Sequence, residues 1–140
     1  MTTIEDISQA HHRIRPFIHR TPVLMNKSLN ELCEAELYFK CENFQKAGSF
    51  KIRGATNAVM LLDDKSISKG IVTVSSGNHG AALAMAVSFR HGKTQVIMPK
   101  NTSKTKVDNV IRNGGKIIWC KPTLQSREKV LKKVIDESGA

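Results

Sequence analysis

Two short stretches of the sequence hold residues that could do chemistry. The run "GSFKIRG" (48–54) places Lys51 between the bulky apolar residues Phe50 and Ile52. Burial lowers the pKa of a lysine, and a neutral amine is a nucleophile. The run "SSGNHG" (75–80) lies between an apolar segment and a helical pattern. Each has an ordinary alternative: a solvated lysine on a helix, and a helix start capped by Ser76 or Asn78.

The second stretch has the features of an anion-binding loop. A buried strand is expected before it and a helix after it, and a helix N-terminus offers unpaired backbone N–H groups and a positive dipole end. Gly77 and Gly80 let the backbone approach a ligand closely. Because ligands of open α/β sheets bind at the carboxyl ends of strands, we expect a carboxylate or phosphate here. The spacing matches neither a dinucleotide fingerprint nor a P-loop.

The elements that must position this loop alternate regularly from residue 70 onward. Continuous apolar runs predict strands, and amphipathic runs predict helices. The expected strands are 71–76, 94–99 and 116–120, and the expected helices are 77–92, 102–113 and 126–139. Strands of this kind alternating with helices predict an α/β fold with a doubly wound, mostly parallel sheet.

The first 69 residues are less regular. Thr2 and Glu5 have the spacing of a capping box, and Asn26 is a candidate cap for a second helix. The expected elements that follow are a helix at 27–35, a strand at 36–42 and a helix at 49–62. Lys51 would then lie in the first turn of the last of these helices.

Composition narrows the function classes. The formal charge of +10 raises the question of nucleic-acid binding, but the lysines are spread out and no aromatic residues interleave with them. We therefore expect no nucleic-acid partner. Cys33, Cys41 and Cys120 show neither metal-ligand spacing nor a disulfide framework, so we expect no metal site and a cytoplasmic, reducing setting. The apolar runs are too short to span a bilayer, so no membrane partner is expected.

Taken together, the two stretches resemble one enzyme family. The run "ENFQKAGSFKIRGA" (42–55), followed by "SSGNHG", is similar to fold-type II pyridoxal-phosphate enzymes, which have a tryptophan synthase beta-like fold. The best match is the serine racemase and serine/threonine dehydratase branch, including "TPV" (21–23) and "NGGKIIWC" (113–120). The resemblance covers essentially the whole chain.

This resemblance implies roles for seven residues. Lys51 would bind pyridoxal phosphate covalently, Phe50 would flank the cofactor ring, and Asn78 would hydrogen-bond the ring's 3′-oxygen. The substrate carboxylate would be received by the loop and by an arginine of the last helix, through Ser75, Ser76, Asn78, His79 and Arg127. No metal ligand is implied within these residues.

The implied chemistry begins with removal of the α-proton of a serine-like amino acid by Lys51. Return of a proton on the opposite face racemises the carbon, and Ser76 matches the residue that does this in the resembling racemases. Loss of the β-hydroxyl instead gives a keto acid and ammonia. The resemblance therefore implies a serine racemase (an isomerase), a serine dehydratase (a lyase), or both. One alternative is a threonine or 3-hydroxyaspartate ammonia-lyase, and a second is a non-catalytic fragment.

Members of this family are longer than 140 residues. The glycine-rich loop for the cofactor phosphate and the acidic ligands of an activating Mg²⁺ are expected beyond these residues. We therefore expect residues 1–69 to be the N-terminal part of a large cofactor-binding domain and 70–140 most of a small α/β domain, incomplete at the C-terminus. The 140 residues alone are expected to be inactive. The complete protein is expected to be a homodimer acting on a small amino acid.

Overall fold

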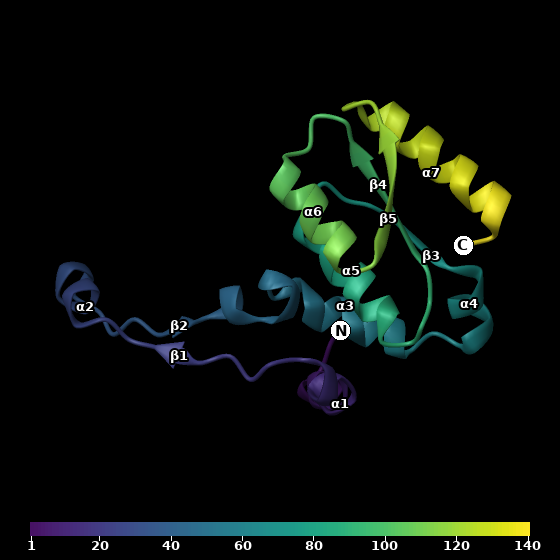
Figure 1. Ribbon diagram of the computed structural model, residues 1–140. Helices are drawn as coiled ribbons and strands as arrows, with labels where there is room; N and C mark the ends of the chain where they lie inside the picture. Colours follow the sequence, from purple (N-terminus) through teal and green to yellow (C-terminus); the bar gives the residue numbers. More distant parts are fainter.

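Three parallel strands form the central sheet of the computed structural model, which describes residues 1–140 (Figure 1). They are β3 (Ile71–Val74), β4 (Thr94–Pro99) and β5 (Gly115–Cys120), in the order β3-β4-β5. In the register of the sheet, Val74 lies beside Ile97, and Ile97 lies beside Ile118. The central strand β4 matches the predicted range, because a strand buried on both faces reads as a continuous apolar run.

Helices cover both faces of this sheet. On one face, α5 (Asn78–Ser88) and α6 (Lys104–Arg112) pack on the strands, and their Ala81 and Val110 contact Val96 and Met98. On the other face, α7 (Leu124–Ser138) packs with Val134 against Ile97 and Cys120. Successive residues of β4 thus point to opposite faces. The predicted doubly wound, parallel α/β arrangement is confirmed.

A second core joins the sheet domain to the preceding helices α3 (Lys51–Met60) and α4 (Asp64–Lys69). Ile52 and Val59 of α3 pack against Ala82, Leu83 and Val87 of α5 in one buried cluster. The helix α3 therefore packs against α5, the helix that follows the loop at residues 75–77. The proposed division at residues 69 and 70 stays a prediction.

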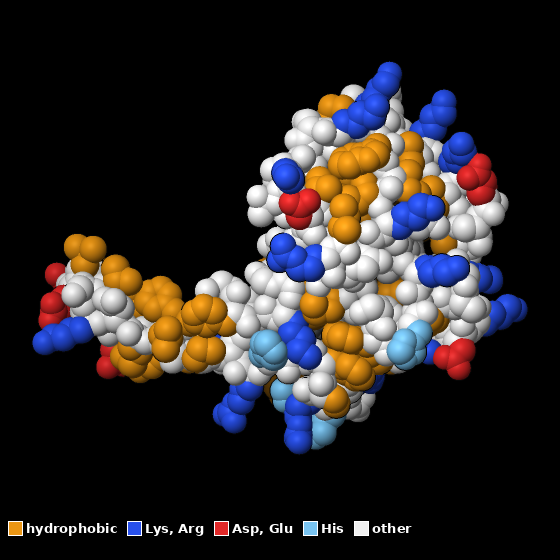
Figure 2. Space-filling model, viewed as in Figure 1, with side chains coloured by type: hydrophobic (Ala, Val, Ile, Leu, Met, Phe, Trp, Pro, Cys, Tyr) orange, Lys and Arg blue, Asp and Glu red, His pale blue; other side chains and the backbone are white.

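The N-terminal residues form helix α1 (Ile4–Ile14) and an arm that extends away from the rest of the molecule (Figure 1). The arm contains β1 (Val23–Leu24), α2 (Lys27–Cys33) and β2 (Phe39–Lys40), with the two strands antiparallel. Apolar side chains gather along it in Figure 2, and the exposed ones are Val23, Leu24, Met25, Leu29, Leu32, Tyr38 and Phe39. No helix of the molecule combines the length and the apolar character needed to span a bilayer.

The structure corrects several predicted boundaries. The capping box of α1 is formed by Thr3 and Asp6, one residue later than predicted, and the paired strand β2 is shorter than 36–42. Asn26 caps α2 as predicted, by accepting a hydrogen bond from Leu29 N at 3.0 Å. The strand predicted over 71–76 ends at Val74, so residues 75–77 are free to form a loop.

Candidate active site

Lys51 lies at the first position of α3, on the side turned away from the core. The buried face of this helix carries Ile52, Thr56 and Val59, at helical spacing. Ala55 is also buried, and at about 100° per residue Lys51 lies at the edge of this face and not within it. The apolar neighbours of Lys51 in the sequence therefore do not bury it: Lys51 is exposed, and its Nζ lies 4.8 Å from the ring centroid of Phe50, which is 57% exposed.

A shallow cavity of about 380 Å³ runs along this outward face of α3. Gly54 and Ala58 follow Lys51 at one-turn intervals, so the helix surface beside the amine is nearly flat. A Cβ built on Gly54 would have no neighbour within 4 Å. The opposite wall comes from His79 and Leu83 of α5. The structure thus brings Lys51 and His79, which are far apart in the sequence, to one cavity.

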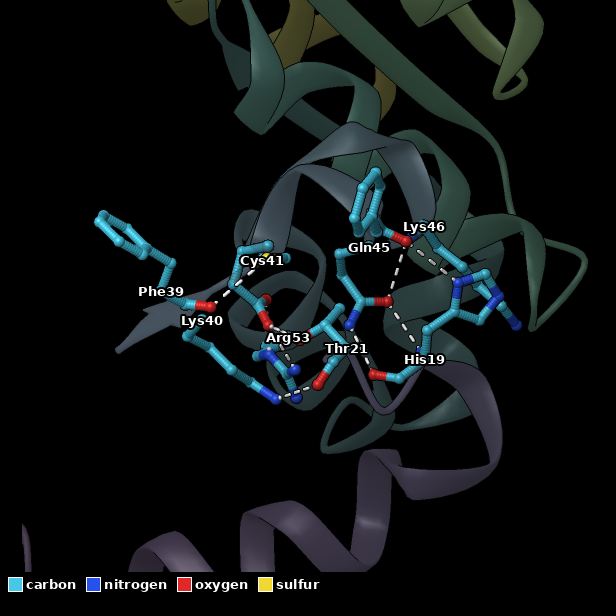
Figure 3. A network of polar contacts seen from close by, with 10 residues as sticks. His19, Thr21, Phe39, Lys40, Cys41, Gln45, Lys46 and Arg53 are labelled. Carbon is cyan, nitrogen blue, oxygen red and sulfur yellow. Dashed lines mark hydrogen bonds and ion pairs between the residues drawn. The ribbon is translucent and has the colours of Figure 1, made fainter. Parts of the chain in front are cut away.

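The turn before Lys51 is held by a polar network (Figure 3). Ala47 and Gly48 both have positive φ, +58° and +76°, which turns the chain sharply into α3. The buried side chain of Gln45 accepts a hydrogen bond from His19 N at 2.8 Å and donates one to His19 O at 2.7 Å. This pair ties the turn to the segment that follows α1, and so fixes where α3 begins.

The same network contains the ion pair of Glu42 and Arg53. Two parallel hydrogen bonds of 2.8 and 2.7 Å join the guanidinium to the carboxylate, and the Thr21 hydroxyl donates a third at 2.6 Å (Figure 3). The bonds from Arg53 are the main reason why the pKa of Glu42 is lowered to about 2, against the opposing effect of burial. The carboxylate in turn raises the pKa of Arg53. Since Arg53 lies two residues after Lys51, this pair anchors the first turn of α3.

The loop at residues 75–80 is organised by Ser75. Its hydroxyl accepts hydrogen bonds from the backbone N–H groups of Gly80, at 3.0 Å, and Gly77, at 3.3 Å. Gly77 is the N-cap residue of α5 and has no side chain to cap the helix. The ordinary alternative, in which Ser76 or Asn78 caps this helix, does not hold, because the N-cap residue is Gly77 and no side chain caps it. Their side chains and that of His79 are exposed.

Gly80 explains why this loop lies so close to the sheet. It is buried, and a Cβ built on it would lie 2.8 Å from Val96 Cγ1 and 3.3 Å from the Ser75 Cβ. A side chain would separate α5 from β4. Glycine at this position therefore lets the first turn of the helix pack directly on the central strand.

Ser76 and Arg127 line a second cavity, of about 390 Å³, which borders the same loop. It also contains Lys106, a residue that the sequence analysis did not single out. The lysine stem covers Gly77, because a Cβ built on that glycine would lie 3.9 Å from both Cδ and Cε of Lys106. Its only sequence signal is the local density of lysines at 100–106.

The seven candidate residues are thus distributed around one loop. Phe50, Lys51 and His79 share the first cavity, and Ser76 and Arg127 share the second. Asn78 lies between Ser76 and His79 in the sequence but lines neither cavity. The Ser75 hydroxyl is engaged in hydrogen bonds within the loop. The histidines, cysteines and acidic residues form no group that could hold a metal ion.

Known proteins that are similar to this chain in sequence and in structure belong to one enzyme family. Residues 14–140 match the family described as pyridoxal-phosphate dependent enzyme. The chain is 52% identical over 137 residues to a serine racemase of Arabidopsis thaliana, covering 98% of this chain and 41% of that relative. It is 50% identical over 137 residues to a beta-hydroxyaspartate dehydratase of Paracoccus denitrificans, covering 98% and 44%.

The structure of a maize serine racemase superposes with a TM-score of 0.96 at 48% identity, covering 99% of this chain and 42% of that one. The chain therefore spans about two fifths of the length of the relatives that it matches.

Proposed function

Because the chain belongs to the pyridoxal-phosphate dependent enzyme family, we propose that the whole protein racemises serine, dehydrates it, or does both. The main support for this proposal is the cavity that Lys51 shares with His79. The loop beside it leads into α5, and the backbone N–H groups at the start of that helix are available to a ligand. An amine nucleophile and an anion-binding loop are the two parts that such chemistry needs on an amino acid.

The residues around Lys51 fit a flat, aromatic aldehyde. The amine is exposed, the helix surface beside it is bare at Gly54, and Phe50 and Leu83 offer apolar walls. When bound, pyridoxal phosphate supplies an electron sink that makes the α-proton of an amino acid acidic. The Asn78 amide, exposed at the first position of α5, is proposed to orient the cofactor ring by a hydrogen bond.

The protein's own groups then handle the substrate. The N–H groups at the start of α5, with Ser76, His79 and Arg127, are proposed to receive the α-carboxylate. Ser75, whose hydroxyl is engaged with Gly77 and Gly80, is proposed to contribute by holding the loop in place. The Lys51 amine removes the α-proton from one face, and the Ser76 hydroxyl returns one on the other. Without that return, the β-hydroxyl leaves as water, and water later replaces the nitrogen, so serine yields pyruvate and ammonia.

One alternative activity is supported by a specific observation. The Paracoccus relative at 50% identity is named a beta-hydroxyaspartate dehydratase, so elimination from 3-hydroxyaspartate is a second candidate. It uses the same α-proton removal by Lys51 and needs no proton donor on the opposite face.

We further propose that the whole protein is a cytoplasmic homodimer. The three cysteines are all free, which supports a reducing compartment. The exposed apolar side chains of the arm (Figure 2) support burial against another polypeptide surface.

The decisive experiment is Lys51→Ala in the whole protein. We expect the variant to lose the borohydride-sensitive visible absorbance of lysine-bound cofactor, and to lose both racemisation and elimination. Lys65→Ala, which removes an exposed lysine of α4 that lines neither cavity, is the matched control and should keep all three. Turnover of serine by Lys51→Ala, with the absorbance retained, would overturn the proposal.

A further inference from the structure

Lys106 is the one cation near the loop for which the proposed chemistry has no use. It is exposed on α6, and its stem lies over Gly77 in the middle of the loop. It makes no ion pair or hydrogen bond through its amine, unlike Lys132 and Lys133, which pair with acids on their own helix. A lysine stem packed on a glycine of a substrate loop places its charge at that loop, rather than free in solvent.

The second cavity has an excess of donors. It is lined by Ser76, Pro99, Asn101, Thr102, Ser103, Lys106 and Arg127, so it holds two cations and no acid. Two buried atoms on its walls, Arg127 Nε and Thr102 Oγ1, have no hydrogen-bond partner. Buried donors without partners are rare in folded proteins, and here they mark a place for a ligand that accepts hydrogen bonds.

The charges can be counted against the proposed substrate. A serine substrate has a single carboxylate, and the proposed function assigns that group to the loop N–H groups and Arg127. The charge of Lys106 is then left uncompensated beside the substrate. A second carboxylate on the substrate would balance it, and a lysine–carboxylate hydrogen bond in a partly enclosed site is among the stronger polar contacts.

We propose that Lys106 is a specificity-determining residue that binds a side-chain carboxylate, so that the preferred substrates are β-hydroxy amino acids with an acidic side chain. The simplest is 3-hydroxyaspartate. The cavity, at about 390 Å³, has room for a four-carbon dicarboxylic acid. This inference rests on the proposed function, because it needs the substrate to lie at the loop.

The elimination balances for this substrate without any oxidant. The Cα–H and Cβ–O bonds break and one water leaves. One water then enters as the nitrogen departs, so 3-hydroxyaspartate gives oxaloacetate and ammonia. The side-chain carboxylate is unchanged throughout, and can therefore stay bound to Lys106 from substrate to product.

The test compares kcat/KM for 3-hydroxyaspartate and for serine in the cofactor-loaded whole protein. We expect wild type to favour the dicarboxylate, and Lys106→Gln to lower the ratio of the two values by about tenfold to a hundredfold. Lys106→Arg should restore most of the ratio, since the charge returns. Lys104→Gln is the matched control, because Lys104 is an exposed lysine of the same helix that does not line the cavity.

A binding measurement separates this inference from the proposed function. Succinate and butyrate are unreactive four-carbon acids with two carboxylates and one, and calorimetry gives their dissociation constants without turnover. We expect succinate to bind about tenfold more tightly than butyrate, and Lys106→Gln to remove that difference. Equal affinity for the two acids, or an unchanged substrate ratio in Lys106→Gln, overturns the inference. Loss of the proposed function appears differently, as wild-type protein without lysine-dependent cofactor absorbance.

Discussion

The hydroxyl of Ser75 accepts a hydrogen bond from the backbone N–H of Gly80 at 3.0 Å, and this bond closes the loop that leads into α5. Four residues lie between Ser75 and Gly80, and this intervening chain bulges outward. Ser76, Asn78 and His79 occupy that bulge, and all three are exposed. The residue that holds the loop is therefore distinct from the residues that the loop presents.

Replacing Gly80 by alanine should destabilise this unit. The added Cβ would meet Val96 Cγ1 at 2.8 Å and the Ser75 Cβ at 3.3 Å, so α5 must shift away from the sheet. Overpacking of this kind costs about 1–3 kcal/mol, and thermal or urea unfolding of the protein without cofactor will measure it. Gly54→Ala is the matched control. It adds a methyl group in open space within a helix, and should stabilise by about 0.5–1 kcal/mol.

The ion pair of Glu42 and Arg53 should make stability depend on pH in acid. The pKa of Glu42 is about 2 in the folded protein, against 4.5 ordinarily, so below pH 4.5 the unfolded chain binds a proton that the folded chain does not. The stabilisation is therefore complete above that pH, and is lost as the pH falls toward 2. We expect the contribution to be about 1–2 kcal/mol after solvent screening.

The measurement is the difference in unfolding free energy between wild type and Glu42→Gln at several pH values. That difference should shrink as the pH is lowered from 4.5 toward 2. The control is Asp136→Asn, which removes an exposed i,i+4 pair with Lys132 and should change the unfolding free energy by less than about 0.5 kcal/mol. A Glu42→Gln difference that is constant with pH would contradict the assignment.

Ser76→Ala in the whole protein should separate racemisation from elimination. If the Ser76 hydroxyl is the second proton donor, the variant loses most D-serine formation from L-serine, and elimination from D-serine. Elimination from L-serine survives in part, because Lys51 still reaches that proton. Ser75, and not Ser76, holds the loop, so the melting temperature should stay close to that of wild type. D-serine and pyruvate are measured from each enantiomer, and a uniform fall of all activities would assign Ser76 a structural role.

The 140-residue chain by itself should bind pyridoxal phosphate weakly and should not turn over serine. Lys51 lies in an open, shallow cavity whose walls come from Phe50, α3 and α5, so little of a bound cofactor would be buried. Titration of the purified chain, followed by visible absorbance and borohydride reduction, measures the affinity. Steady production of pyruvate from L-serine by this chain would show the expectation to be wrong.

Local sequence patterns were enough to predict the architecture, because they reflect burial directly. A strand such as β4 is buried on both faces, so its residues are apolar without alternation, and the chain must cross over through a helix to reach the next parallel strand. Lys51 and Asn78 were singled out differently, because the short contiguous stretches that carry them resemble one enzyme family, and their roles stay predictions. Burial of Lys51 by its apolar sequence neighbours did not follow, since its side chain is exposed.

Other features were decided only by the tertiary structure. Two adjacent serines have the same chemistry, and only the folded loop distinguishes them: the Ser75 hydroxyl accepts the Gly80 N–H, whereas Ser76 is exposed. Lys106 reaches Gly77 because the crossover from β4 to β5 places α6 beside α5 on the same face of the sheet. Sequence spacing carries no record of such contacts, because they depend on how separate elements dock, and that is set by the shape of the shared core.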